Sequence, residues 1–152
     1  MIWPLVIAIL VIIADQLFKH WIVMHISLGM SISLIPHVLS LTNIRNNGAA
    51  WSILSGQTIF FYVITVIAII LLSYLYIKSL RNKRAFLYRL GLALVLAGAL
   101  GNFIDRLRFK YVVDMFQLDF INFPIFNIAD MALTIGVILI IIYEIWLDKN
   151  GN

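Results

Sequence analysis

Four long apolar runs decide what this chain can fold into. They cover residues 2–24, 59–77, 86–104 and 128–147, and each is long enough to cross about 30 Å of hydrocarbon as a helix. The chain is 63% hydrophobic and 12% charged over its 152 residues, whereas soluble domains are usually near half apolar and about a quarter charged. Because the surplus must face lipid, we predict a membrane all-α protein: a four-transmembrane-helix bundle forming a single domain over residues 1–152.

The distribution of basic residues orients this bundle. The segment 78–84, between the second and third runs, carries four Lys or Arg and no acid. The positive-inside rule places such a segment in the cytoplasm, so four spans put both termini in the cytoplasm and two loops outside. Pro4 and Asp15 interrupt the first run and no small-residue cleavage site follows it, which favours a retained helix over a removed signal peptide. Although the net charge is +4, the basic residues bunch beside apolar runs, which argues against a nucleic-acid partner.

The two outer loops differ in character. The first, residues 25–57, is long and nearly uncharged. Its segments 31–35 and 37–41 alternate partly between polar and apolar residues, which predicts short strands in a small extracytoplasmic β-sheet. The second loop, residues 106–126, ends in the segment 118–126, which is too apolar for free solvent, so we expect it to rest on the membrane or cover a site. We also expect a short outer-surface loop helix.

Polar side chains gather at one depth of the predicted bundle, its outer end. The helical rise places Asp15 about 20 Å along the first helix, with Lys19 one turn further on the same face, in the order that favours an ion pair. The third helix ends at this level and the fourth begins there, and Asp114 lies in the loop between them. The polar residues that these two helices contribute are Asn102, Asp105, Arg106, Asn127 and Asp130.

Asp114 and Asp130 are the strongest candidates for chemistry. Carboxylates beside hydrocarbon cost free energy and are rarely placed there without a use. Two carboxyls held close in a low dielectric share one proton, so the ionised one can take a proton from water and the protonated one can donate to a carbonyl oxygen or a leaving amine. Aspartic peptidases work in this way, without metal, serine or cysteine. The chain has no cysteine, and its three histidines show no metal-ligand spacing.

Structural roles for the same residues stay open at this point. Asp114 can cap a turn while Asp130 pairs with Arg106. An Asp105–Arg106 pair can hold a loop to a helix end. Three further residues have equally structural interpretations, as an ion pair or as a turn residue: Asp15, Lys19 and Asn46.

Two non-enzyme functions also compete. A proton-coupled transporter or channel subunit uses buried carboxyls, but it predicts acidic groups spaced through the membrane depth, whereas here they lie at one end. A lipid-binding or assembly subunit fits the small size of the chain and its almost wholly apolar helices. It does not explain two aspartates without matching cations nearby in the sequence.

Five short motifs carry a resemblance to a known family. They are DQLFK at 15–19, NNGAAW at 46–51, GNFIDR at 101–106, VVDMF at 112–116 and FNIAD at 126–130. In this order, on a four-helix frame of this length, they make the chain resemble the lipoprotein signal peptidases, the bacterial type II signal peptidases, over nearly its whole length. One departure is Trp51, where the family usually has phenylalanine, and it bears only on the shape of that loop.

The resemblance implies an aspartic endopeptidase of the bacterial cytoplasmic membrane, multi-pass, with its active site toward the outer face. The implied substrates are prolipoproteins that carry diacylglycerol on a cysteine, with cleavage just before that cysteine. Membrane lipids and the inhibitor globomycin are the other implied partners, and no metal or cofactor is implied. Asp114 and Asp130 are then the catalytic dyad. The implied site-lining residues are Asn46, Asn102, Asp105, Arg106 and Asn127, and the implied supporting residues are Asp15 and Lys19.

Overall fold

The computed structural model describes residues 2–48, 57–81 and 86–149. Its four long helices are α1 (Trp3–His25), α2 (Thr58–Ser79), α3 (Phe86–Phe109) and α4 (Ile128–Lys149). Each contains a stretch long and apolar enough to cross a membrane, which confirms the predicted four-helix membrane bundle. α3 continues past the predicted end at 104, because Arg106 and Arg108 supply the positive charge that a helix C-terminus favours.

α3 is the central helix and packs against the other three. Glycines let α4 approach it closely. A Cβ added at Gly136 would lie 2.6 Å from the carbonyl oxygen of Gly91, and one added at Gly91 would lie 2.8 Å from the carbonyl oxygen of Gly136. Small residues at such contacts are typical of membrane bundles, where close backbone packing replaces the hydrophobic force that lipid removes. This contact sets the position of α4, and therefore of its first turn, relative to α3.

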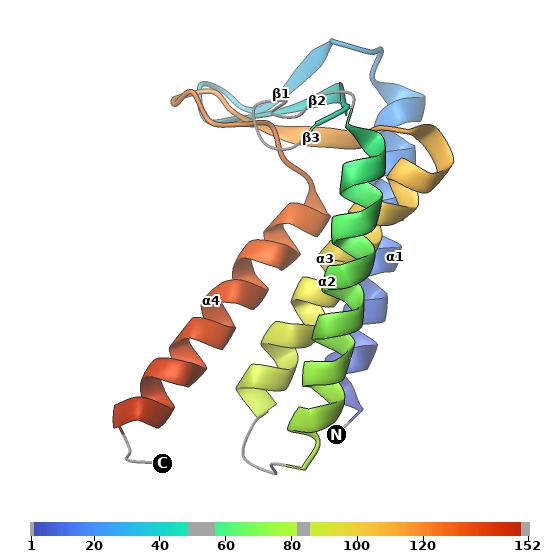
Figure 1. Ribbon diagram of the computed structural model, residues 1–152. Helices are drawn as coiled ribbons and strands as arrows, with labels where there is room; N and C mark the ends of the chain where they lie inside the picture. Colours follow the sequence, from blue (N-terminus) through green and yellow to red (C-terminus); the bar gives the residue numbers. More distant parts are fainter. Residues whose placement is uncertain (1, 49–56, 82–85, 150–152) are drawn as a thin grey trace.

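A three-stranded antiparallel sheet covers one end of the bundle, opposite the end where both termini lie (Figure 1). Its strands, in the order β1-β2-β3, are β1 (Ser31–Ile35), β2 (Leu39–Asn46) and β3 (Val112–Leu118). β1 confirms the first predicted strand. β2 begins two residues later than predicted, because His37 has a φ of 62° and belongs to the turn, and it continues to Asn46. We call this end of the molecule the sheet end.

Two features of the loops differ from the prediction. β3 lies in the loop 106–126, where no strand was expected, and it forms because it completes the far side of β2 while burying Val112, Val113 and Met115. No helix besides the four occurs within residues 2–48, 57–81 and 86–149, so the expected loop helix has no counterpart there. Residues 49–56, Trp51 among them, lie outside the described residues.

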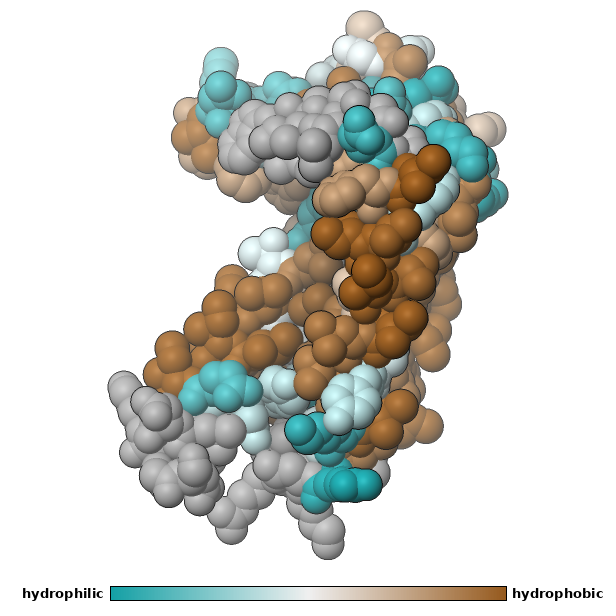
Figure 2. Space-filling model, in the orientation of Figure 1, coloured by the Kyte–Doolittle hydropathy of each residue, from teal (hydrophilic) through white to brown (hydrophobic). Residues whose placement is uncertain are grey.

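The helices carry their apolar side chains outward. Only 6% of the apolar stretch of α2 and 22% of those of α1 and α4 is buried, whereas more than half of the stretch in α3 is buried. Figure 2 shows the apolar surface over the helices, with hydrophilic residues concentrated toward the two ends. An apolar exterior around a small internal core is the pattern of a multi-pass membrane protein.

Candidate active site

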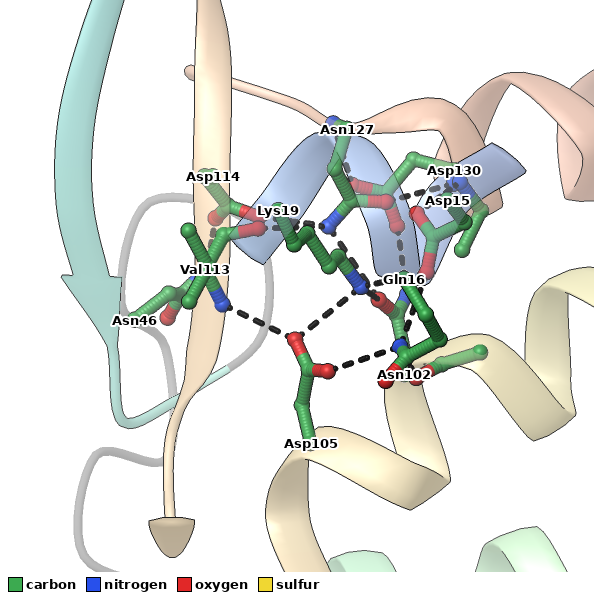
Figure 3. Close-up of polar contacts among 12 residues, drawn as sticks. Asp15, Gln16, Lys19, Asn46, Asn102, Asp105, Val113, Asp114, Asn127 and Asp130 are labelled. Carbon is green, nitrogen blue, oxygen red and sulfur yellow. Dashed lines mark hydrogen bonds and ion pairs between the residues drawn. The ribbon is translucent and has the colours of Figure 1, made fainter. Parts of the chain in front are cut away.

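The predicted polar residues come together beneath the sheet, where α1, α3, α4, β2 and β3 meet (Figure 3). All nine lie at or beside this cluster: Asp15, Lys19, Asn46, Asn102, Asp105, Arg106, Asp114, Asn127 and Asp130. The arrangement follows from the topology. α3 ends and α4 begins under the sheet, and β3 spans the connection between them.

Asp114 reaches the cluster from the middle of β3 and is 3% exposed. Its Oδ1 accepts a hydrogen bond of 2.6 Å from Nδ2 of Asn127, and its Oδ2 accepts one of 2.9 Å from Nδ2 of Asn46. The Asn46 amide is held in this direction because its Oδ1 accepts the Gly48 N–H at 2.9 Å. Asp114 therefore does not cap a turn. It points from a strand into the bundle.

Asp130 lies in the first turn of α4. Its Oδ2 accepts the backbone N–H of Asn127 at 3.1 Å, while Oδ1 of Asn127 accepts the N–H of Asp130 at 2.9 Å. The pair forms a reciprocal cap of the helix N-terminus, where a carboxylate is also favoured by the helix dipole. Oδ1 of Asp130 accepts a further bond of 2.8 Å from Nδ2 of Asn102. No ion pair joins Asp130 to Arg106 in the part of the chain that the structure describes.

Lys19 lies at the centre of the cluster and is 3% exposed. It makes ion pairs of 2.9 Å with Oδ2 of Asp15 and 3.0 Å with Oδ2 of Asp105, which confirms the expected Asp15–Lys19 pair on α1. It also donates to Oδ1 of Asn102 at 3.1 Å. Because an ammonium group only donates, this bond requires the Asn102 amide nitrogen to face Asp130.

Asp15 and Asp105 bind backbone as well as Lys19. Oδ1 of Asp15 accepts the N–H of Ala129 at 3.0 Å, so α1 supplies an acceptor to the first turn of α4. Oδ2 of Asp105 accepts the N–H of Val113 at 3.1 Å and so ties β3 to α3. Asp105 therefore bonds with Lys19 and the strand, and Arg106 turns elsewhere.

Arg106 forms part of the wall of a cavity. Its Nη2 donates to the carbonyl oxygen of Gly48 at 3.1 Å, and its guanidinium carbon lies 4.8 Å from the ring centroid of Phe61. The cavity measures about 540 Å³, and a recess between the sheet and α4 is visible on the face in Figure 2. Its polar wall includes both candidate aspartates, and its apolar wall includes residues 123–126 together with Met131, Leu133 and Ile135 of α4.

The apolar segment at the end of the second loop lines this cavity rather than lying free. Phe126 is bonded to Phe116 of β3 in both directions, at 3.1 and 2.8 Å, which closes the intervening residues into a loop. Phe123, Pro124 and Ile125 then face the cavity. The position fits the expected cover over a site.

Gln16 belongs to the cluster, and the sequence had not singled it out as a site residue. Its Nε2 donates to Oδ1 of Asp105 at 2.9 Å, to the carbonyl oxygen of Gly101 at 3.2 Å and to Oδ2 of Asp15 at 3.2 Å. The available signal was its place directly after Asp15, as another polar side chain in an apolar run. Gln16 joins α1 to α3 at the level of the candidate dyad.

Burial makes Asp114 hard to ionise. It raises the pKa of Asp114 to about 7, and the charge of Asp130 acts in the same direction, while the amides of Asn46 and Asn127 oppose the shift. A carboxyl with a pKa near neutrality can both hold and release a proton at physiological pH, which is the property required of a general acid.

A matching family model and two similar proteins all belong to one family of peptidases. The model of the family described as signal peptidase (SPase) II matches residues 7–146. The lipoprotein signal peptidase of Latilactobacillus sakei is 56% identical over 149 residues, covering 98% of this chain and 97% of that protein. The protein of the same name from Lactiplantibacillus plantarum is 59% identical over 138 residues, or 91% of each chain.

Two solved structures, both described as bacterial membrane enzymes, share the fold. One has a TM-score of 0.89 at 45% identity and covers 98% of this chain and 91% of its own. The other has a TM-score of 0.82 at 48% identity and covers 92% of this chain and 90% of its own. The first of these alignments covers nearly the whole chain and therefore includes the sheet and all four helices.

Proposed function

This chain belongs to the signal peptidase II family, and from that premise we propose that Asp114 and Asp130 are its catalytic dyad. The protein is a membrane aspartic peptidase that removes signal peptides from prolipoproteins. The observation that carries the assignment is the single side chain that joins the two carboxyls. Asn127 donates to Asp114 and caps the same helix turn as Asp130, and both aspartates line the same cavity.

The surroundings of the two carboxyls divide the acid and base roles between them. Both Asp130 oxygens accept hydrogen bonds from N–H groups whose direction is fixed, and Asp130 lies at a helix N-terminus that favours a negative charge. Lys19 adds to this preference through Asn102. Asp114 lies on a strand without such a dipole. In the resting enzyme, Asp130 is the ionised base that takes a proton from water, and Asp114 holds the proton that is passed to the substrate.

The remaining site residues hold this dyad in place and border the substrate. Asn46 and Asn102 each orient one carboxyl, and Arg106 directs a guanidinium into the cavity. Behind them, Asp15, Lys19 and Asp105 form the buried ion-pair cluster that ties α1, α3 and β3 together. The whole assembly belongs to one domain, residues 1–152.

The cavity suits a substrate that stays partly in lipid. Its apolar wall on α4 is continuous with the exposed side chains of Met131 and Ile135, so a signal helix and two acyl chains can stay in the bilayer while the peptide bond reaches the dyad. We place the sheet end outside the cytoplasmic membrane and both termini in the cytoplasm, since Lys78 and Arg81 of the basic segment 78–84 lie at the opposite end. Diacylglyceryl-modified prolipoproteins are the substrates, and globomycin-type inhibitors occupy the same cavity.

The test uses the purified full chain and a prolipoprotein carrying diacylglycerol, with the unmodified prolipoprotein as a second substrate. We expect Asp114→Asn and Asp130→Asn each to abolish cleavage of the lipidated prolipoprotein. We also expect the wild type to leave the unmodified prolipoprotein uncleaved. The matched control is Asp119→Asn, which removes an exposed carboxyl just beyond β3 that bonds only Ser40 and Gln117 among the described side chains. Cleavage at the wild-type rate by either dyad variant contradicts the assignment.

A further inference from the structure

A stack of cations and aromatic rings lies beside the end of α3, away from the dyad. The Arg108 guanidinium carbon lies 5.0 Å from the ring centroid of Phe109, and that ring stacks on Tyr111 with 5.7 Å between centroids. The Arg45 guanidinium carbon, from β2, lies 4.9 Å from the Tyr111 centroid. Two exposed arginines are thus held on one pair of stacked rings.

Lys110 adds a third cation in an unusual backbone position. It follows the last residue of α3, has a φ of 69°, and donates its N–H to the carbonyl oxygen of Arg106 at 3.0 Å. Glycine is favoured at this helix-ending position because a side chain is strained there. The lysine side chain has contacts of its own: its ammonium lies 5.5 Å from the Tyr62 centroid and donates to the Tyr62 hydroxyl at 3.3 Å. We call Arg45, Arg108 and Lys110 the basic rim.

The basic rim carries charge without carboxylate partners. Within the described residues, ion pairs shorter than 4 Å involve only Lys19, so none of the three rim cations is neutralised by an acid there. Excess Lys and Arg beside the outer ends of membrane helices runs against the positive-inside rule. Cations in such a place require another source of negative charge, and arginine is the side chain best shaped to bind phosphate.

The surface below the rim faces lipid. Leu107 and Phe109, at the end of α3, are 51% and 43% exposed, and aromatic rings such as Tyr62 and Tyr111 are typical of the membrane interface. Cations directly above exposed apolar side chains lie at the level of the phospholipid headgroups. The exposed apolar side chains at the end of α3 therefore contact acyl chains, while the charged groups of the stack reach the phosphates.

We propose that the basic rim binds the phosphate of an anionic phospholipid in the outer leaflet and thereby sets the depth of the active site. Arg108 lies six residues beyond Asn102 on the same helix, which is about 9 Å along its axis. Asn102 bonds directly to Asp130. A phosphate held at the rim thus places the dyad one headgroup thickness deeper, at the glycerol level. The depth argument rests on the proposed function, whereas the lipid site rests only on the proposed orientation of the helices in the membrane.

The experiment measures lipid retention and cleavage separately. Full-length protein in nanodiscs of phosphatidylcholine, with or without phosphatidylglycerol, is analysed for bound phosphatidylglycerol by native mass spectrometry. The test variant is Arg45→Gln/Arg108→Gln/Lys110→Gly, in which glycine keeps the backbone position of Lys110 unstrained. The matched control is Lys78→Gln/Arg81→Gln, which removes two cations from the opposite end of the bundle.

We expect the rim variant to bind phosphatidylglycerol between about tenfold and a hundredfold more weakly than the wild type, since each cation contributes about one charge–headgroup contact. The control variant keeps the rim-bound lipid. In phosphatidylglycerol discs the wild type cleaves lipidated substrate with a higher kcat/KM than in phosphatidylcholine discs, and the rim variant shows no such difference.

Three results overturn the proposal: equal phosphatidylglycerol retention by the rim variant and the wild type, equal retention of phosphatidylcholine at the rim, or displacement of the lipid by millimolar inorganic phosphate, which indicates a site for soluble phosphate. Asp114→Asn separates the two proposals, because it keeps the rim-bound lipid whether or not it loses cleavage. Equal kcat/KM of the wild type in both discs, with rim binding intact, overturns the depth-setting role.

Discussion

Asn127 and Asp130 cap each other at the start of α4, with each side chain accepting the backbone N–H of the other at 2.9 and 3.1 Å. The carboxylate that we assign as the base is therefore also part of its own helix terminus. The remaining amide group of Asn127 donates to Asp114 at 2.6 Å. One residue thus couples the start of a membrane helix to the distance between the two carboxyls that we propose as the dyad.

Asn127 variants separate these two roles. Asn127→Ser keeps an oxygen that can cap the helix but removes the amide donor to Asp114, whereas Asn127→Ala removes both. We expect the alanine variant to lose about 1 kcal/mol more of unfolding free energy than the serine variant. Both lose roughly 100-fold in kcat because the dyad is no longer aligned. Thermal unfolding in detergent and steady-state cleavage measure the two effects, and a serine variant with wild-type kcat excludes the coupling.

Removing the central cation tests the buried ion-pair cluster. Lys19→Met leaves Asp15 and Asp105 buried without their shared partner, which costs roughly 3–5 kcal/mol of unfolding free energy. Lys19→Met/Asp105→Asn recovers part of this loss, since one of the two unpaired charges disappears. Chemical denaturation of the purified variants checks the order, and equal stability of the single and double variants contradicts it.

The helical part of the fold follows from the sequence because lipid leaves few alternatives for four long apolar runs. β3 does not, because its residues 112–118 become a strand only when β2 offers an edge, and that pairing joins segments about 70 residues apart in the sequence. The start of β2 was misjudged for a local reason: His37 adopts a left-handed backbone conformation in the turn.

The candidate site shows the same division. Helical rise and topology brought Asn102, Asp105, Asn127 and Asp130 to one level, and the structure joins them there. The hydrogen-bond partner of each side chain depends on the rotation and crossing angles of the helices, which the helical rise does not give. Asp105 faces Lys19 and the N–H of Val113 rather than Arg106, its neighbour in the sequence. Gln16 was missed because the hydrogen-bond partners of its amide lie on α3, far away in the sequence.

The pKa of Asp114 predicts how stability depends on pH. Because burial raises this pKa from 3.8 to about 7, the folded protein binds a proton that the unfolded chain releases between these values. The contribution of Asp114 to stability therefore falls as pH rises through this window, by about 4 kcal/mol at most. Asp114→Asn removes this fall, so its unfolding free energy exceeds that of the wild type at pH 8 by about 1–3 kcal/mol once a lost hydrogen bond is allowed for.

Unfolding in detergent at pH 5 and pH 8 measures this difference for the wild type and Asp114→Asn. Asp119→Asn is the control for loss of one negative charge, since Asp119 is exposed just beyond the same strand. A wild-type protein and an Asp114→Asn variant with the same pH dependence between these values contradict the assignment of Asp114 as the residue that holds the proton.

The glycine contact between α3 and α4 gives a last prediction, which concerns alignment from a distance. A Cβ at Gly136 meets the Gly91 carbonyl oxygen at 2.6 Å and Cγ2 of Val95 at 2.7 Å, so Gly136→Ala forces α4 away from α3. Asp130 lies about 9 Å along α4 from this point and moves with the helix. We expect a loss of about 1–3 kcal/mol in unfolding free energy and at least tenfold in kcat.

Gly29→Ala is the matched control, because a Cβ there meets nothing within 4 Å, although its φ of 78° strains an alanine. It costs about 1 kcal/mol through the backbone alone and leaves α4 in place, so kcat stays at the wild-type value. Stability loss in both variants with loss of kcat only in Gly136→Ala identifies the helix contact as what aligns the dyad. Equal kcat in both variants shows that α4 tolerates displacement and that the reciprocal cap alone positions Asp130.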